Sequence, residues 1–227
     1  MKIASYNIRK AVGLDWRRDP ERVAEVLLEI DADVVVLQEA DRRTGTRAGV
    51  LPIERLESEL GYLLPDFSIR ALSHGWHGNA ILLRSRYDSH AARRIDLPSI
   101  DPRGAVSVQI ADPCVEIIGV HLGLTPGTRR KQVDVLRQVL QGQTHPVILA
   151  GDFNEWNLKR LDFGSDAQIV SPGLSFHAAR PRAALDLFVL GPGLRVVSSH
   201  VHKSTLAVRA SDHLPIVITV DFTKAEP

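Results

Sequence analysis

Cysteine, aromatic residues and long apolar runs are all scarce in this sequence. A single cysteine, Cys114, excludes an internal disulfide and is typical of a protein in a reducing compartment. No stretch approaches the roughly 20 apolar residues of a transmembrane helix, and the N-terminus enters a strand-like pattern without an apolar signal region. We therefore expect a cytoplasmic protein without stable membrane insertion, in which Cys114 is a small buried residue of a strand.

An excess of charge of one sign is also missing. The formal net charge of +1 excludes a surface that binds polyanions indiscriminately, and the 5% of aromatic residues offers few platforms for stacking nucleic-acid bases. Only six of the 28 basic residues are lysines. The planar arginine side chain suits phosphate, but a biased genome composition produces the same skew. Hydrophobic residues (44%) and charged residues (24%) occur in ordinary globular proportions, which excludes disordered and membrane classes.

The apolar spacing predicts helices that alternate with strands. Asp19 followed by Pro20 is a helix start, and helical spacing then continues to about residue 31. Two further helices are predicted over residues 52–60, closed by Gly61, and over residues 129–140. Short runs rich in β-branched residues predict buried strands over residues 2–7, 33–38, 80–83, 105–110, 115–120, 147–150, 185–190, 195–199 and 215–220.

No linker, low-complexity tract or short repeat interrupts this pattern, so a single domain over residues 1–227 is predicted. Helices and strands alternate in both halves, with antiparallel-type strands between them. This order predicts an α/β (α+β) fold in which two sheets pack face to face with helices outside.

Polar side chains stand where the apolar runs end, and this is the most informative feature of the sequence. Within the helix–strand pattern, they follow or precede the predicted strands along the whole chain. The residues concerned are Asn7, Glu39, His121, Asp152, Asn154, Asp186, Asp212 and His213.

Each of these residues has an ordinary structural interpretation when it is taken alone. Asparagine and aspartate favour turns, a lone acid can mark the return of the chain to solvent or the edge of a sheet, and a lone histidine is most often buried with its hydrogen bonds satisfied. Asp212 and His213 together could cap a helix or form a loop pair. Their joint occurrence at strand ends favours one site, because ligands in such folds gather beyond strand termini.

The residue types indicate a site for a hard cation. Carboxylate and amide oxygens without a cysteine cluster suit Mg²⁺ or Mn²⁺, and Mg²⁺ takes only one or two protein carboxylates, so Glu39 with Asn7 suffices. Two histidines and two further acids remain for proton transfer and phosphate contact. This set fits metal-assisted attack of water on a phosphorus ester.

Seven segments carry a resemblance that spans residues 6–215. They are Tyr6-Asn7-Ile8-Arg9, Leu37-Gln38-Glu39, Gly78-Asn79-Ala80-Ile81-Leu82, His121-Leu122, Gly151-Asp152-Phe153-Asn154, Leu185-Asp186-Leu187-Phe188-Val189 and Ser211-Asp212-His213-Leu214-Pro215. In this order they resemble the endonuclease/exonuclease/phosphatase superfamily, the DNase I-like metallohydrolases. The resemblance implies a four-layer sandwich of two mixed β-sheets flanked by helices, with the site at one edge.

The resemblance also implies which residues bind the metal and the substrate. Asn7 and Glu39 would hold the divalent metal, Mg²⁺ or in its place Mn²⁺, with Asp212 as a further or water-bridged ligand. Asn154 would donate a hydrogen bond to a phosphate oxygen. Asn79 would line the phosphate pocket.

The same resemblance implies catalytic roles. Asp152 would orient or deprotonate the attacking water. His213 would contact the scissile phosphate and would be oriented by Asp186, as a carboxylate orients the histidine of a catalytic triad. His121 would act as a general acid or as a hydrogen-bond donor in the transition state.

Differences from the family pattern indicate which class of substrate to expect. Ile8-Arg9-Lys10 stands where abasic-site repair enzymes have Asn or Asp followed by Gly, and Leu187 stands where they have an aromatic residue or Arg. The chain is also short for the long loops that grip duplex DNA. We predict a Mg²⁺-dependent phosphodiesterase whose substrate is a small diester, a phospholipid head group or a nucleic acid, held by one or two arginines. No protein partner is implied.

Two alternatives remain. The first is a DNA endonuclease, either abasic-site or non-specific, which basic side chains around the cleft would favour. The clusters that could supply them are Arg42, Arg43, Arg47, Arg129, Arg130 and Lys131. The second alternative is a non-catalytic binding module with the same fold, because a fold alone does not fix a function.

Overall fold

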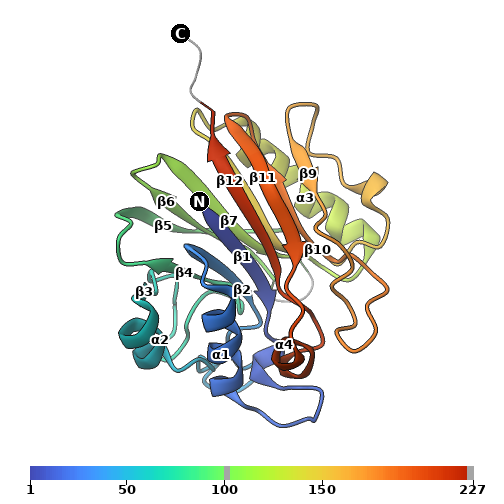
Figure 1. Ribbon diagram of the computed structural model, residues 1–227. Coiled ribbons are helices and arrows are strands. Elements are labelled where there is room, and N and C mark those ends of the chain that lie inside the picture. Colours follow the sequence, from blue (N-terminus) through green and yellow to red (C-terminus); the bar gives the residue numbers. More distant parts are fainter. Residues whose placement is uncertain (100–102, 224–227) are drawn as a thin grey trace.

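The computed structural model describes residues 1–99 and 103–223, and within them two mixed β-sheets lie face to face (Figure 1). The first sheet has the strand order β11-β12-β1-β2-β4-β3, and the second has the order β5-β6-β7-β8-β10-β9. Helices cover the two outer faces. The predicted four-layer α+β sandwich is therefore confirmed.

The elements have the following bounds. The first sheet contains β1 (Lys2–Asn7), β2 (Val34–Gln38), β3 (Tyr62–Leu63), β4 (Ala80–Arg84), β11 (Leu194–Val201) and β12 (Ile216–Phe222). The second contains β5 (Ser89–Ile95), β6 (Ala105–Ile110), β7 (Val115–His121), β8 (Val147–Asp152), β9 (Gln168–Val170) and β10 (Asp186–Leu190). The helices are α1 (Pro20–Ile30), α2 (Ile53–Leu60), α3 (Pro126–Gln141) and α4 (Thr205–Ala210), with 3-10 turns η1 (Arg9–Ala11) and η2 (Leu158–Arg160).

Three hydrophobic cores lie between the four layers, and β2 contributes side chains to two of them. Successive side chains of a strand point to opposite faces. Val34 and Val36 therefore enter the core between the two sheets, whereas Val35 and Leu37 enter the core beneath α1, α2 and α4. The third core lies between the second sheet and α3. Burial on both faces explains why β2 is an unbroken apolar run rather than an alternating one.

The ends of two parallel strand pairs define the edge at which polar residues gather. β1 and β2 run parallel, with Asn7 beside Gln38, and β7 and β8 run parallel, with His121 beside Asp152. β10 runs antiparallel to β8, so its first residue, Asp186, lies beside Asp152. β12 is antiparallel to β1, which brings the loop before it to the same edge.

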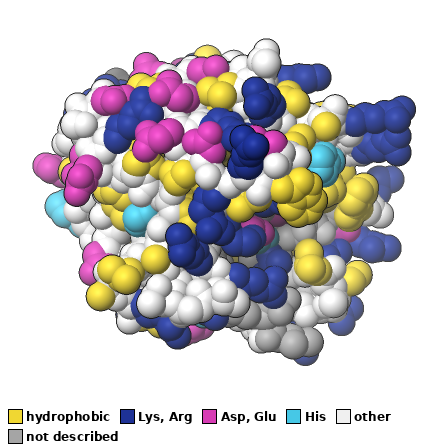
Figure 2. Space-filling view, turned by 90° about the horizontal axis from the view of Figure 1, so that it is seen from below, with side chains coloured by type: hydrophobic (Ala, Val, Ile, Leu, Met, Phe, Trp, Pro, Cys, Tyr) yellow, Lys and Arg dark blue, Asp and Glu magenta, His cyan; other side chains and the backbone are white. Residues whose placement is uncertain are grey.

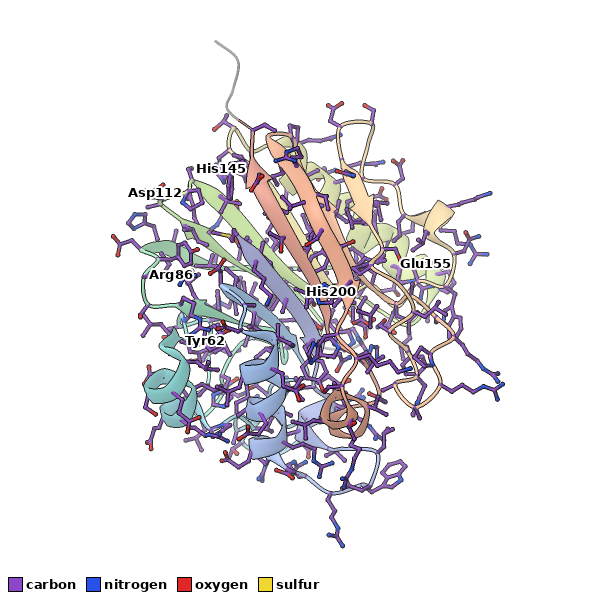
Figure 3. All side chains as sticks on the ribbon, viewed as in Figure 1. Tyr62, Arg86, Asp112, His145, Glu155 and His200 are labelled. Carbon is purple, nitrogen blue, oxygen red and sulfur yellow. The ribbon has the colours of Figure 1, made fainter. Side chains whose placement is uncertain are left out.

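Cys114 corrects one expectation, because it is exposed in a turn rather than buried in a strand. The hairpin between β6 and β7 turns at residues 111–114, and Asp112 lies at its tip (Figure 3). The first paired residue of β7 is Val115, opposite Ile110. β7 thus begins at the residue that the apolar pattern predicted, and Cys114 belongs to the turn that Asp112 and Pro113 form before it.

Gly151 occupies a position in β8 that only glycine fits. Its φ is +156°, and a Cβ there would lie 1.9 Å from the backbone oxygen of Val120 on β7. We expect Gly151→Ala to lower the free energy of unfolding by about 3 kcal/mol, because overpacking would force the two strands apart. Urea unfolding measures this effect. Gly127→Ala is the matched control, since a Cβ at Gly127 meets nothing within 4 Å. Equal unfolding midpoints for the two variants would contradict the prediction.

Candidate active site

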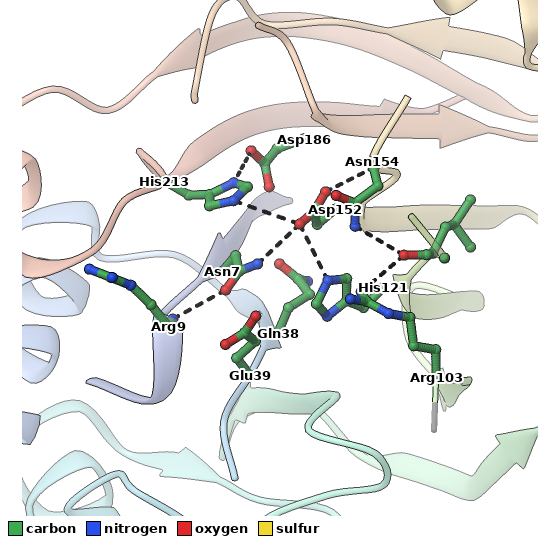
Figure 4. Close-up of polar contacts among 12 residues, drawn as sticks. Asn7, Arg9, Gln38, Glu39, Arg103, His121, Asp152, Asn154, Asp186 and His213 are labelled. Atoms are coloured by element: carbon green, nitrogen blue, oxygen red, sulfur yellow. Dashed lines mark hydrogen bonds and ion pairs between the residues drawn. The ribbon is translucent and has the colours of Figure 1, made fainter. Parts of the chain in front are cut away.

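His213 is held in one orientation by Asp186. The Nδ1 atom of His213 lies 2.8 Å from Oδ2 of Asp186 (Figure 4). That oxygen also accepts a hydrogen bond from the Ser175 hydroxyl. The ring of Phe176 packs against the imidazole, with 4.9 Å between ring centroids. Asp186 is fully buried and lies in β10, between β8 and β9. It is therefore not the edge-strand charge that the sequence left open.

Asp152 is the hub of the site. Its Oδ2 accepts a hydrogen bond from Nδ2 of Asn7 at 3.0 Å, and it lies 3.4 Å from Nε2 of His121 and 3.7 Å from Nε2 of His213 (Figure 4). Its Oδ1 accepts the backbone N–H of Asn154 at 2.9 Å. Groups from four strand ends or loops thus converge on one buried carboxylate.

The pKa values of Asp152 and His213 are displaced in ways that suit proton transfer. Burial raises the pKa of Asp152 to about 6, although the nearby His213 charge opposes the rise. Burial alone would lower the pKa of His213, but the charge and the hydrogen bond of Asp186 raise it to about 10. At neutral pH the site therefore combines an ionised carboxylate with an imidazolium that donates hydrogen bonds.

His121 has the opposite charge state from His213. Burial lowers the pKa of His121 well below its ordinary value, and the positive charges of Arg103 and His213 lower it further. The imidazole is neutral at neutral pH and has one N–H to donate. This state favours a hydrogen-bond donor over a general acid as the role of His121.

The predicted metal ligands present oxygen atoms that already attract cations. Glu39 forms an ion pair with Lys10, and Asp212 lies 3.4 Å from Nε of Arg9. Oδ1 of Asn7 accepts the backbone N–H of Arg9 at 3.1 Å, which leaves one lone pair on that oxygen. Asn7 pairs with Gln38, the residue before Glu39, so both predicted ligands lie at this edge of the sheet (Figure 4). An all-oxygen set with two carboxylates fits a hard divalent cation.

The backbone explains how Glu39 reaches this position. Glu39 follows β2 in a left-handed conformation with φ 56°. The loop before β4 packs against it through Gly78, whose φ is +83° and where a Cβ would lie 3.3 Å from Cα of Glu39. A larger residue at Gly78 would push the loop away from Glu39, so the glycine of the Gly-Asn-Ala segment fixes the predicted ligand.

A second set of groups could also hold a metal ion. Asp152, Asp186 and His213 each offer a ligand atom, and these atoms lie within 4.8 Å of one another. In this set Nδ1 of His213 and Oδ2 of Asp186 already pair with each other at 2.8 Å.

The two predicted asparagines differ in their surroundings. Nδ2 of Asn154 donates to the backbone oxygen of Leu122 at 3.0 Å, which leaves its second N–H for another acceptor. Asn79 was predicted to line the phosphate pocket, but its side chain is fully buried. Its Nδ2 donates to the backbone oxygen of Gly104 at 2.9 Å. Asn79 therefore fixes the segment beside the site instead of forming its surface.

Several residues at the site carried no sequence signal. Ser175 lies 11 residues from Asp186 in the chain, and Lys10 lies 29 residues from Glu39, so neither contact shows as a local motif. Ser211 is different, because it stands within the Ser-Asp-His segment. Its hydroxyl donates to the backbone oxygen of Asn7 at 2.7 Å and joins the loop before β12 to the end of β1.

A basic pocket opens beside Glu39 and His121. One lysine and five arginines contribute to its walls. Figure 2 views this edge of the molecule and shows Lys and Arg side chains gathered around the middle of the face. The lining residues are Lys10, Glu39, Asp41, Arg42, Arg43, Arg47, Ile69, Arg70, Ser73, Gly75, Trp76, His77, Gly78, Arg103 and His121.

Arg129 has a structural role and does not line the rim of a cleft. Its side chain is buried, and its guanidinium forms an ion pair with Glu155 at 2.9 Å. It also donates to the backbone oxygens of Gly123 and Leu124. Only its neighbours Arg130 and Lys131 remain exposed.

The chain belongs to the Endonuclease/Exonuclease/phosphatase family, because the sequence pattern of that family matches residues 4–213. YbhP of Escherichia coli K12 is 26% identical over an alignment of 244 positions, and the alignment covers 95% of this chain and 94% of YbhP.

The fold is also shared with solved structures. An endonuclease/exonuclease/phosphatase of Beutenbergia cavernae has a TM-score of 0.71 at 21% identity and covers 98% of this chain and 72% of its own. TDP2 of D. rerio, complexed with a single-strand DNA product, has a TM-score of 0.75 at 18% identity and covers 97% of this chain and 98% of its own. Among the described residues, no helix has both the length and the apolar character to cross a membrane.

Proposed function

We propose that this protein is a divalent-cation-dependent phosphodiesterase that hydrolyses a P–O bond by attack of water. The observation that carries the proposal is the buried Asp152 carboxylate, which lies 3.7 Å from Nε2 of the His213 imidazolium. A base near its working pKa beside a fixed cationic donor suits hydrolysis of an anionic ester. Membership of the Endonuclease/Exonuclease/phosphatase family supports the same reaction class.

We assign the metal site to Asn7 and Glu39, with Asp212 as a direct or water-bridged ligand. These oxygens suit Mg²⁺, with Mn²⁺ as a substitute. A bound divalent cation supplies positive charge for the oxygens of the reacting phosphate. The set of Asp152, Asp186 and His213 is less suitable, because Oδ2 of Asp186 is already engaged by Nδ1 of His213 and by the Ser175 hydroxyl.

The remaining roles follow from the contacts. Asp152 accepts a proton from the attacking water, whose oxygen forms the new bond to phosphorus as the bond to the leaving oxygen breaks. The leaving group departs as an alkoxide and takes a proton from solvent. His213 donates through Nε2 to an oxygen of the phosphate, while Asp186 holds Nδ1. Asn154 donates its second N–H to another phosphate oxygen, and His121 donates its single N–H toward the same charge.

Asp186→Asn tests the orienting role of this carboxylate. We expect kcat to fall about 10- to 100-fold, which is less than for His213→Ala, because Asp186 does not contact the substrate. The pKa of His213 should also fall from its raised value, since the nearest negative charge is lost. A histidine NMR titration and steady-state kinetics measure both effects. An unchanged titration of His213 together with a normal kcat would contradict the assignment.

A single activity panel tests the proposed function. It compares abasic duplex, plain DNA, RNA, a phospholipid and an aryl phosphodiester, each with Mg²⁺ and with Mn²⁺. We expect cation-dependent hydrolysis, with the small diester or the phospholipid cleaved at least as efficiently as the abasic duplex. The proposal would be overturned if none of these substrates were hydrolysed.

A DNA endonuclease is the second candidate, and the arginines of the basic pocket favour it. Affinity for duplex DNA falls by about one log unit per log of salt for each phosphate contact. We expect a shallow slope, equivalent to about two or three contacts. A strong preference for abasic duplex with a steep salt slope would select the endonuclease.

A further inference from the structure

The basic pocket is continuous with the proposed reaction site. Glu39 and His121 line it, and Lys10, which pairs with Glu39, lines it as well. His121 is in turn 3.4 Å from Oδ2 of Asp152. A molecule whose phosphate lies at Asp152 and His213 therefore has its next groups directed toward either this pocket or the solvent.

The charges of the pocket converge from separate parts of the chain. Arg42 and Arg47 come from the loop after β2, and Arg70 comes from the loop before β4. Among the described residues no carboxylate forms an ion pair with any of these three arginines. The positive charge on this wall is therefore available to a ligand.

The acids of the pocket do not cancel this charge. Glu39 is paired with Lys10. Asp41 is buried, and its two carboxylate oxygens accept hydrogen bonds of 2.7 Å from the backbone N–H of His74 and from the hydroxyl of Ser73. Asp41 thus fixes the loop that carries Arg70, and its one negative charge is outnumbered by the five arginines of the pocket.

A single phosphate at the reaction site does not contact Arg42, Arg47 and Arg70, because the groups of the reaction site already bind its oxygens. We propose that the substrate carries a second phosphate group and that this group binds in the basic pocket against Arg42, Arg47 and Arg70. The inference rests on the proposed function and narrows its substrate class to small diesters that bear a further phosphomonoester. Arginine suits such a group, because its planar fork donates two hydrogen bonds to phosphate oxygens.

The gathering of the basic side chains in one pocket favours a compact anion over a continuous strand. They line this pocket together with Trp76 and with Gly75 and Gly78 of the loop before β4. Trp76 is itself buried and packs against His77, with 4.4 Å between ring centroids. A nucleic-acid track would need cations in a row that extends past this wall.

Two matched substrates test the proposal. The first is the para-nitrophenyl ester of thymidine 5′-phosphate, and the second is the same ester with an added 3′-phosphate. We compare kcat/KM for the wild type, for the double variant Arg42→Ala/Arg47→Ala and for Arg195→Ala. Arg195 pairs with Asp221 at the opposite end of the sheet and is the control. Thermal unfolding verifies that each variant is folded.

The expected result is a preference of the wild type for the bisphosphate substrate of about tenfold or more, the effect of one charge-assisted contact. Arg195→Ala should retain this preference, and the double variant should lose most of it. Cleavage of both esters without any preference would overturn the inference and leave the proposed function standing. A single-stranded oligonucleotide cleaved better than the bisphosphate ester would overturn it in favour of a nucleic-acid site. Cleavage of neither ester would overturn the inference, and it would overturn the proposed function as well if the substrates of the activity panel were also left uncleaved.

Discussion

Asp152→Asn and His213→Ala are each expected to lower kcat by about 10³- to 10⁵-fold, while the protein remains folded. Asp152→Asn removes the proton acceptor but keeps the shape of the hub, and the asparagine can still receive the Asn7 amide. His213→Ala removes the imidazolium that Asp186 holds against the phosphate. Steady-state kinetics on an aryl phosphodiester measure both losses.

The double variant Asp152→Asn/His213→Ala tests whether the two residues act together in one step or contribute independently to the rate. Residues that act together are strongly non-additive, so the double variant should lose little more than the more damaging single change. Asp166→Asn, an exposed acid in the loop after β8, controls for the loss of one negative charge. If the single losses simply multiplied in the double variant, Asp152 and His213 would not be one unit.

Removal of the divalent cation is the second large effect. A chelator should abolish turnover, and Mg²⁺ or Mn²⁺ should restore it. Glu39→Gln should raise the Mg²⁺ concentration for half-maximal activity by about tenfold or more, because a charged ligand is replaced by a neutral one of the same shape. Calcium should support little turnover, since its looser coordination positions the substrate and water poorly.

The control for Glu39 is Glu57→Gln, an exposed acid on α2. Its Mg²⁺ dependence should match that of the wild type. Wild-type activity of Glu39→Gln at limiting Mg²⁺ would show that Glu39 is not a ligand. A Mg²⁺ dependence that changed instead in Asp186→Asn, with Glu39→Gln normal, would move the metal to the set of Asp152, Asp186 and His213.

Much of the fold was predictable because buried strands and capped helices have local signatures. Asp19 accepts the backbone N–H of Arg22 at 3.0 Å at the start of α1, and Gly61 closes α2 with φ +60°. β5 was not predicted, because its sequence Ser-His-Ala-Ala-Arg-Arg-Ile is almost entirely exposed at the edge of its sheet. Hydrogen bonds to β6 hold it in place, and they leave no apolar pattern in the sequence.

The part of the candidate site that lies at strand ends was predictable from the sequence. Asn7, His121 and Asp152 are the last residues of their strands. Parallel pairing places His121 beside Asp152 in the second sheet, and the face-to-face packing of the two sheets adds Asn7 from the first. Contacts made by tertiary packing were not predictable. The burial of Asn79 beside Gly104 depends on how the loops before β4 and β6 meet. The convergence of arginines in the basic pocket depends on these two loops and on the loop after β2, and net charge does not reveal it.

Hydrolysis of an aryl phosphodiester, followed by release of para-nitrophenol, tests the central claim most directly when the wild type and Asp152→Asn are compared at saturating Mg²⁺. The proposed site predicts cation-dependent release by the wild type and a rate lower by about 10³-fold or more in the variant. Equal rates for the two proteins would contradict the assignment of this carboxylate as the centre of the reaction.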